Sequence, residues 1–330
     1  MNEYDTTPRQ PESSTADGKS DGWGRDVLEK LAFATLKEQR ARRRWGIFFK
    51  LAYLAAIFVA IWLAFDYGGT DADAVGPHTA LVEIDGTIEA GGGSGAADSV
   101  IPALNKAFGD SESVGVILHI NSPGGSPVQA GMINDEMLRL RKAYPKKPLY
   151  VVVDEMCASG GYYIAAGADK IFVNKASIIG SIGVLMDGFG FTGLMDKLGV
   201  ERRLLTAGEN KGFLDPFSPQ TPQQKQYALA MLEEIHQQFI GVVRAGRGTR
   251  LKETPDMFSG LFWSGAKAVE LGLADGFGTI NSVARDLKAE NLVDYTEHEG
   301  LSERVLKKFG ASIGAGAFKS AMQGVKPTLH

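Results

Sequence analysis

Residues 149–165 have the sequence LYVVVDEMCASGGYYIA. The run Leu149–Val153 is apolar and has the length of a buried strand, and a Gly-rich turn follows it at residues 159–161. The same order recurs upstream in residues 114–126, VGVILHINSPGGS, ahead of a helix that we predict over Pro127–Ala143. Continuous apolar strands that alternate with helices are typical of parallel sheets covered on both faces. The sequence therefore predicts an α/β fold with largely parallel strands.

Further elements extend this pattern on both sides. A capping box at Thr221, with proline at the first helical position, predicts a helix whose apolar stripe runs to Val242. An amphipathic pattern over Leu301–Met322 predicts a helix near the end of the chain. The remaining expected elements are strands at Thr79–Ile84, Lys170–Val173, Ile182–Leu185 and Arg202–Leu205, and a helix at Ala97–Phe108. We place the main domain at residues 79–290 and a helical tail at 291–330.

The stretch Trp45–Phe65 predicts a transmembrane helix. It contains one charge, Lys50, and at about 1.5 Å per residue it spans about 30 Å, the thickness of the hydrocarbon layer. Five basic residues lie in 37–44 and acidic ones follow from Asp66, so the positive-inside rule places the N-terminus in the cytoplasm. We expect a cytoplasmic, largely disordered basic arm at 1–44, the span at 45–65 and a linker at 66–78.

Two other interpretations of this segment remain open. A buried core helix is one, although 15 consecutive apolar residues at 51–65 exceed what a half-exposed helix needs. A cleaved signal peptide is the other. Ala72-Asp73-Ala74 resembles a cleavage site, but it lies well past the apolar run, and 44 residues are too many for the polar start of a signal peptide.

Composition excludes several functional classes. The net charge of -4 leaves no basic excess to neutralise phosphates, which argues against a nucleic-acid partner. The chain has 1 cysteine, Cys157, so it can form neither an internal disulfide nor a cysteine-rich zinc site.

The two Gly-rich turns are the places where chemistry is expected. Each follows a strand and precedes a helix, so its backbone N–H groups are free to bind a phosphate or an oxyanion. Neither turn matches the phosphate-binding motifs of nucleotide sites, which favours the oxyanion. Ser159 stands at such a strand-to-helix turn, where an exposed hydroxyl lies next to the N–H of Gly160. It is the candidate nucleophile.

A serine nucleophile needs a base, and histidine is scarce. None lies between His119 and His236, and His119 sits inside an apolar strand. A lysine can replace histidine only if its pKa falls from about 10.4 to near neutrality, at a cost of about 4 kcal/mol. Lys211 is a candidate among several lysines, because Phe213 and other apolar residues surround it in sequence.

Carboxylates are the obstacle to this assignment. Glu209 and Asp215 lie close to Lys211 in sequence, and an ion pair with either would keep the amine charged.

Several further motifs lie between about Thr79 and about Leu287. They are ASGGYYIA (158–165), IGSIGV (179–184), the Lys211 segment with DPFSP (215–219), WSG (263–265), AVELGLAD (268–275) and the less specific INSPGG (120–125). Together these motifs resemble the signal peptide peptidase A family. One departure is Asn210, which stands where the family commonly has tyrosine before its lysine.

The resemblance implies a fold and a chemistry. The fold would be that of Clp protease and the crotonases, with stacked ββα units. Ser159 would be the nucleophile, Lys211 the general base, and Ser181 the residue that orients the amine. The oxyanion would be bound by the N–H groups of Gly125, Gly160 and also Gly124. No metal or cofactor is implied.

The resemblance also implies a setting. Members assemble into homo-oligomeric rings or domes and cleave hydrophobic signal peptides left in the bacterial inner membrane, with the catalytic domain on the periplasmic side. Three alternatives remain: a related dyad protease that clips stomatin-type membrane proteins, a crotonase-like acyl-CoA enzyme that needs neither Ser159 nor Lys211, and a scaffold with an inactive site.

Overall fold

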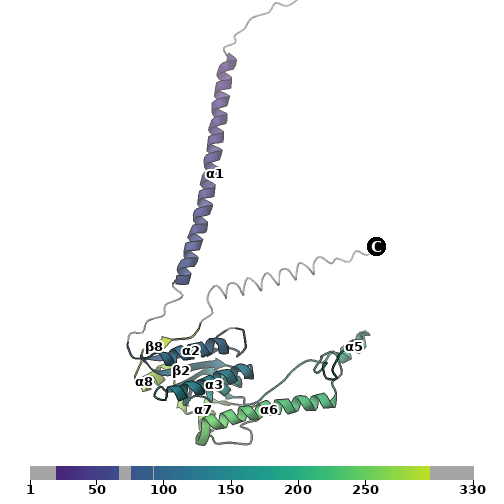
Figure 1. The fold of residues 1–330 in the computed structure, drawn as a ribbon. Helices are drawn as coiled ribbons and strands as arrows, with labels where there is room; N and C mark the ends of the chain where they lie inside the picture. The colour runs from purple at the N-terminus through teal and green to yellow at the C-terminus, as the bar shows by residue number, and fades with distance from the viewer. Residues whose placement is uncertain (1–19, 67–75, 92, 298–330) are drawn as a thin grey trace, which may run out of the picture. The chain divides into compact units, whose positions relative to one another are not determined.

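The computed structural model describes residues 20–66, 76–91 and 93–297 (Figure 1). The chain forms two compact units, residues 1–70 and 71–330, which are considered separately. Of the expected segments, residues 1–19, most of the linker and the predicted helix at 301–322 lie outside the described residues.

The first unit is one long helix, α1 (Ser20–Asp66). Its part from Arg42 to Trp62 is long and apolar enough to cross a membrane, and none of this part is buried. Residues 20–44 were expected to be largely disordered, and that expectation is wrong for this structure, because the helix continues through them. The basic residues before the span therefore extend the helix.

The second unit is built on a mixed sheet in which the predicted parallel pairing dominates. The strand order is β6-β5-β3-β2-β1-β8; in addition, β4 pairs with β3, and β7 pairs with β4. Only β6 runs antiparallel to its neighbour among the described strands. The elements are β1 (His78–Asp85), α2 (Ala97–Gly109), β2 (Ser113–Ser122), α3 (Pro127–Ala143), β3 (Leu149–Ala158), α4 (Gly160–Ala165), β4 (Lys170–Val173), β5 (Ile178–Gly180), α5 (Thr192–Leu198), α6 (Pro222–Arg247), the 3-10 turn η1 (Gly248–Arg250), β6 (Phe262–Ser264), α7 (Gly265–Glu270), β7 (Gly276–Phe277), α8 (Ile280–Asp286) and β8 (Leu292–Asp294).

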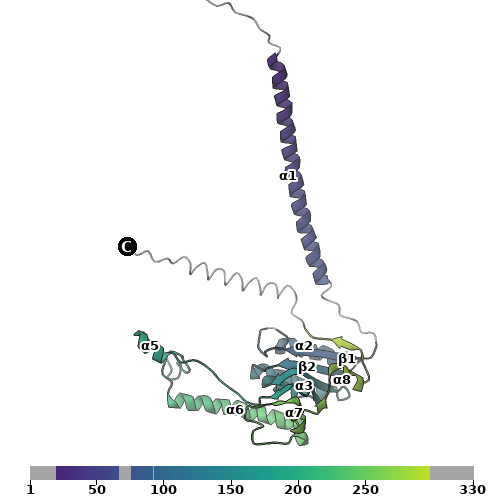
Figure 2. The same ribbon diagram turned by 180° about the vertical axis from the view of Figure 1, so that it is seen from behind.

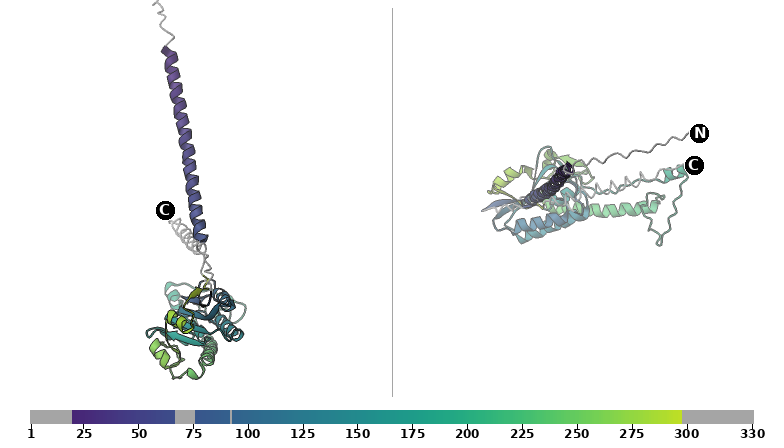
Figure 3. Two further views of the ribbon diagram at one scale, coloured as in Figure 1. Left: turned by 90° about the vertical axis from the view of Figure 1, so that its left-hand side faces the viewer. Right: turned by 90° about the horizontal axis from the view of Figure 1, so that it is seen from above.

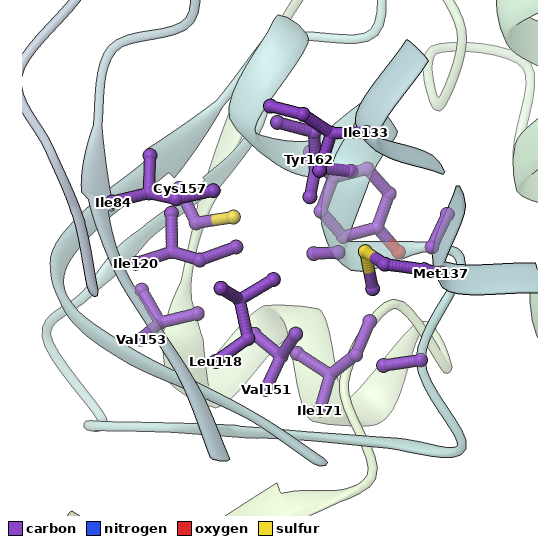
Figure 4. Close-up of a cluster of buried hydrophobic side chains, with 14 of the residues drawn as sticks. Ile84, Leu118, Ile120, Ile133, Met137, Val151, Val153, Cys157, Tyr162 and Ile171 are labelled. Carbon is purple, nitrogen blue, oxygen red and sulfur yellow. The ribbon is translucent and has the colours of Figure 1, made fainter. Parts of the chain in front are cut away.

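Both faces of the central strands are covered along their apolar runs, which is why these runs are continuous rather than alternating. Val151 and Val153 point into the main core, where helix α3 contributes Ile133 and Met137 (Figure 4). Val152, the residue between them, belongs to a smaller cluster on the opposite face, which α8 covers. Side chains of a strand alternate between faces, so a continuous apolar run buries both of them.

Two predicted strands are absent from the described chain. Ile182–Leu185 forms no strand, because Ser181 before it has φ 50° and turns the chain; the observed strand is β5, just upstream. Arg202–Leu205 also forms no strand, since it lies in an exposed segment without a neighbouring strand. In the segment expected as a helical tail, Leu292–Asp294 instead forms β8 and pairs with β1. The domain therefore continues past residue 290.

Residues 185–221, which we call the arm, project from the sheet at the free end of α6. Helix α6 begins as predicted, at a capping box in which Thr221 accepts from the Gln224 backbone and Gln224 accepts from the Thr221 backbone. Views from the front, from behind and from above agree that α6 leads from the sheet to α5 (Figures 1, 2 and 3). Large apolar side chains of the arm are exposed, among them Phe189 at 80% and Leu205 at 96%.

Candidate active site

Ser159 lies at the junction of β3 and α4, as the sequence predicted. Its backbone has φ 50° and ψ −121°, a conformation that an L-residue adopts only under constraint. The constraint is visible in the contacts. The Ser159 N–H donates to the Gly180 carbonyl at 2.8 Å, which ties the turn to the end of β5. Strain held in this way at a serine is a feature of nucleophile turns.

The two Gly-rich turns meet at this serine. A Cβ added to Gly124 would lie 2.7 Å from both the Gly160 nitrogen and the Ser159 Cβ. A Cβ on Gly125 would lie 2.1 Å from the Ile88 carbonyl oxygen. Both glycines also have positive φ, 99° and 151°. Only glycine allows the turn after β2 to approach the Ser159 turn this closely.

The hydrogen bonds distinguish among the three predicted oxyanion donors. The N–H of Gly124 already donates to the Ser122 hydroxyl at 3.1 Å. The N–H groups of Gly125 and Gly160 have no acceptor among the described residues. The carbon that an alanine would add at Gly160 would lie 3.2 Å from the Gly125 nitrogen, so the two N–H groups are neighbours. They are the pair that is free to bind an oxyanion.

A cavity of about 750 Å³ opens in front of this arrangement. Ser159, Gly160, Gly125 and Ser181 lie on its wall, so four of the six predicted site residues share one space. Much of the remaining wall is apolar and comes from α3, α4, α6 and the residues after Ser181; it includes Pro127, Tyr163, Val184, Leu232, Ile235 and Phe239. Such a cavity fits an apolar side chain beside a reacting carbonyl.

Lys211 is not brought to Ser159 within a single chain. It lies in the arm between α5 and α6, is exposed, and does not line the cavity. Lys211 forms no ion pair with Asp215 in the described structure. The Asp215 carboxylate instead accepts hydrogen bonds from the Ser218 hydroxyl at 2.6 Å and from Arg202 at 3.3 Å. These hydrogen bonds lower the pKa of Asp215, and the one from Ser218 has the largest effect; desolvation of the carboxylate acts in the opposite direction.

Neither His119 nor His236 lies on the wall of the cavity at Ser159. His119 lies 3.3 Å from a Glu83 oxygen and takes no part in the cavity wall. His236, on α6, was not singled out by any sequence pattern. Its Nε2 lies 3.1 Å from the carbonyl oxygen of Ile182, the residue after Ser181. No local motif could have revealed this contact, because the two residues are 54 positions apart.

Chemically, the site combines a serine hydroxyl with two adjacent free N–H groups. This combination can stabilise the negative oxygen of a tetrahedral intermediate in acyl transfer, where each donor is worth about 3 kcal/mol. Among the residues that the structure describes, no lysine lies on the cavity wall to serve as the base.

Comparison with known proteins gives matches over this same region. A family model described as "Peptidase family S49" matches residues 141–294. The protein "Na(+)/H(+) antiporter NhaA" of Brucella abortus is 43% identical over 214 residues, which are 64% of this chain and 29% of that protein. "Putative signal peptide peptidase SppA" of Enterococcus faecium is 34% identical over 194 residues, 58% of this chain and 56% of that protein. "Putative protease slr0021" of Synechocystis is 30% identical over 200 residues, 61% of this chain and 69% of that protein. The chain thus spans less than a third of the Brucella relative and about half of the Enterococcus one.

Proposed function

The chain belongs to peptidase family S49, and from this we propose that it is a membrane-anchored serine peptidase with Ser159 as its nucleophile. The expected resemblance to the signal peptide peptidase A family is confirmed, and so is the fold class, the α/β fold of Clp protease and the crotonases. One observation carries the proposal: the strained Ser159 faces the same apolar cavity as the free N–H groups of Gly125 and Gly160.

The proposed reaction follows the geometry step by step. The Ser159 Oγ attacks the peptide carbonyl, and its proton passes to the uncharged amine of Lys211. The carbonyl oxygen becomes an oxyanion held by Gly125 and Gly160. Lys211 then gives the proton to the leaving amine, which leaves an ester on Ser159. Water, deprotonated by Lys211, breaks this ester and restores the serine.

We assign Lys211 to the site of a neighbouring copy of the chain. The arm that carries Lys211 projects from its own sheet (Figure 1), while none of the described residues on the wall of the cavity at Ser159 is a lysine. The apolar side chains exposed on the arm, such as Phe189 and Leu205, suit burial against another subunit. Burial there would also remove water from the amine, which a lysine base requires. Ser181, on the cavity wall, would then orient the incoming amine.

The proposed substrates are hydrophobic peptides in or near a bacterial inner membrane, signal peptides above all. Support comes from the apolar cavity and from the part of α1 that can cross a membrane. The Enterococcus relative is named as a signal peptide peptidase, which points to the same substrates. The basic residues before the span favour a cytoplasmic N-terminus and a catalytic domain on the other side of the membrane, which is the orientation we propose.

Covalent labelling tests the nucleophile. We expect a fluorescent fluorophosphonate to label the full-length protein in detergent at one serine, and the Ser159→Ala variant to lose the label. Labelling of another serine, or retention of bound CoA by an unlabelled protein, would contradict the proposal.

Mixed oligomers test the neighbouring-subunit base. Ser159→Ala and Lys211→Ala variants are each expected to be inactive alone. Coexpressed, they form some sites that combine an intact Ser159 with an intact Lys211 from another copy, so peptidase activity returns. Activity that stays absent in verified mixed oligomers would place both residues in one chain. Mass spectrometry of membrane peptides that accumulate with Ser159→Ala identifies the natural substrates.

A further inference from the structure

The turn that carries Ser181 is held at three successive residues. The Gly180 carbonyl accepts from the Ser159 N–H at 2.8 Å, and the Ser181 N–H donates to the Leu261 carbonyl at 2.8 Å. The third contact is the one from His236 to the Ile182 carbonyl, at 3.1 Å. The first two are backbone bonds, whereas the third comes from a side chain on α6.

The direction of the third hydrogen bond follows from its partner. A carbonyl oxygen can only accept, so Nε2 of His236 must carry the proton and donate it. The side chain of Ile182 is fully buried and held by the core, so the direction of its carbonyl group is set by the hydrogen bond to His236. His236 therefore fixes the orientation of the peptide unit between Ile182 and Gly183, one residue past Ser181.

Strain makes this support necessary. Ser181 has φ 50°, a backbone conformation that costs about 1–3 kcal/mol and persists only where the surroundings enforce it. Ser159 has the same φ, and the two turns are joined through Gly180. Loss of one of the three contacts would let the Ser181 turn relax, and its hydroxyl would move on the cavity wall.

We propose that His236 is a positioning residue, which holds the Ser181 hydroxyl in line with the catalytic amine through the Ile182 carbonyl. This inference rests on the proposed peptidase function. His236 itself does not line the cavity, although its neighbour Ile235 does. It acts on catalysis through the turn and makes no contact with substrate.

The design of the experiment uses the length of the donor. The side-chain nitrogen of glutamine reaches about as far from the backbone as Nε2 of histidine, whereas asparagine reaches only as far as Nδ1. His236→Gln keeps a donor for Ile182, and His236→Asn keeps the polarity without the reach. The matched control is Gln237→Ala, since Gln237 is the next residue of α6 and is exposed.

We expect His236→Asn to lose about tenfold to a hundredfold in kcat on a fluorogenic apolar peptide, the cost typical of a misplaced catalytic group. KM should change less than about twofold, because the cavity wall is intact. His236→Gln should recover most of kcat, and Gln237→Ala should match the wild type. Active sites are counted with fluorophosphonate, and thermal denaturation compares the stability of all variants.

Four outcomes have distinct meanings. Equal kcat for the Gln and Asn variants would overturn the positioning role, and so would a fall in stability that fully parallels the fall in kcat. Ser159→Ala is measured alongside, and its full activity would overturn the peptidase proposal instead. An inactive Ser159→Ala with a fully active His236→Asn would remove the present inference alone.

Discussion

Gly124→Ala is predicted to disable the site at its most crowded point. The added Cβ would lie 2.7 Å from the Gly160 nitrogen, 2.7 Å from the Ser159 Cβ and 2.8 Å from the Ala158 carbonyl oxygen. Two of these three atoms belong to the backbone, so no flexible side chain can move aside. The turns after β2 and β3 must separate to relieve the contacts.

Two costs follow from the geometry. Alanine at φ 99° costs about 1–3 kcal/mol, and overpacking costs about 1–3 kcal/mol more, so unfolding free energy should fall by roughly 2–6 kcal/mol. Separation of the turns also moves Gly160 away from Gly125. Loss of one oxyanion donor lowers kcat by about a hundredfold to a thousandfold.

The matched control is Gly131→Ala, on helix α3. Nothing lies within 4 Å of a Cβ at Gly131, and alanine in a helix is more stable than glycine by about 0.5–1 kcal/mol. Both variants are compared by fluorophosphonate labelling rate and by chemical denaturation, with Gly131→Ala expected to label normally and resist unfolding slightly better. A folded Gly124→Ala that labels as fast as the wild type would refute this account of the site.

Three other perturbations have defined outcomes. Arg247→Met should lower the free energy of unfolding by about 3–5 kcal/mol in chemical denaturation, because it leaves Asp275 without its fully buried partner; the double variant with Asp275→Asn should recover part of this loss. The pKa of Asp110 is lowered, and the largest cause is the hydrogen bond that Tyr295 donates to its carboxylate. The stability that this hydrogen bond provides is therefore present above about pH 4 and is lost as the pH falls through the folded-state pKa of Asp110. Denaturation of Tyr295→Phe should therefore show a deficit against the wild type at pH 7 that shrinks toward pH 2, and a constant deficit would contradict this. Deletion of residues 1–66 should move the protein from the membrane pellet to the soluble fraction, whereas continued sedimentation with membranes would show a second attachment.

Local patterns were sufficient for the central fold. The apolar runs and caps predicted α3 and β4 with their observed bounds, and β1 and α2 within one residue at each end. These elements are long or strongly patterned, and their faces are decided by burial within the chain. That both Gly-rich turns serve one oxyanion site was implied by the family resemblance, and in the structure the two turns approach each other closely at Ser159.

Short and long-range features were not predictable in the same way. Strands β5 and β6 have three residues each and pair with one another near Ser181, so no periodicity marks them. Arg202–Leu205 was predicted as a short strand, but no strand lies beside it among the described residues. Under the proposed assignment of Lys211 to a neighbouring copy, its position relative to Ser159 depends on how the copies meet, which no local pattern encodes. The contact of His236 with Ile182 depends on packing between distant segments.

Helix α6 has an unequal attachment along its length. Its 26 residues span about 39 Å, and four of its five buried residues lie between Phe239 and Arg247. Arg247 is bound at its base to the Gly272 carbonyl and to Asp275, while the opposite end carries the arm. Helix α6 is thus fixed to the core at its C-terminal end and carries the arm at its N-terminal end. We expect that docking of another molecule on the arm would shift the N-terminal end of the helix, and with it His236 and the Ile182 carbonyl next to Ser181.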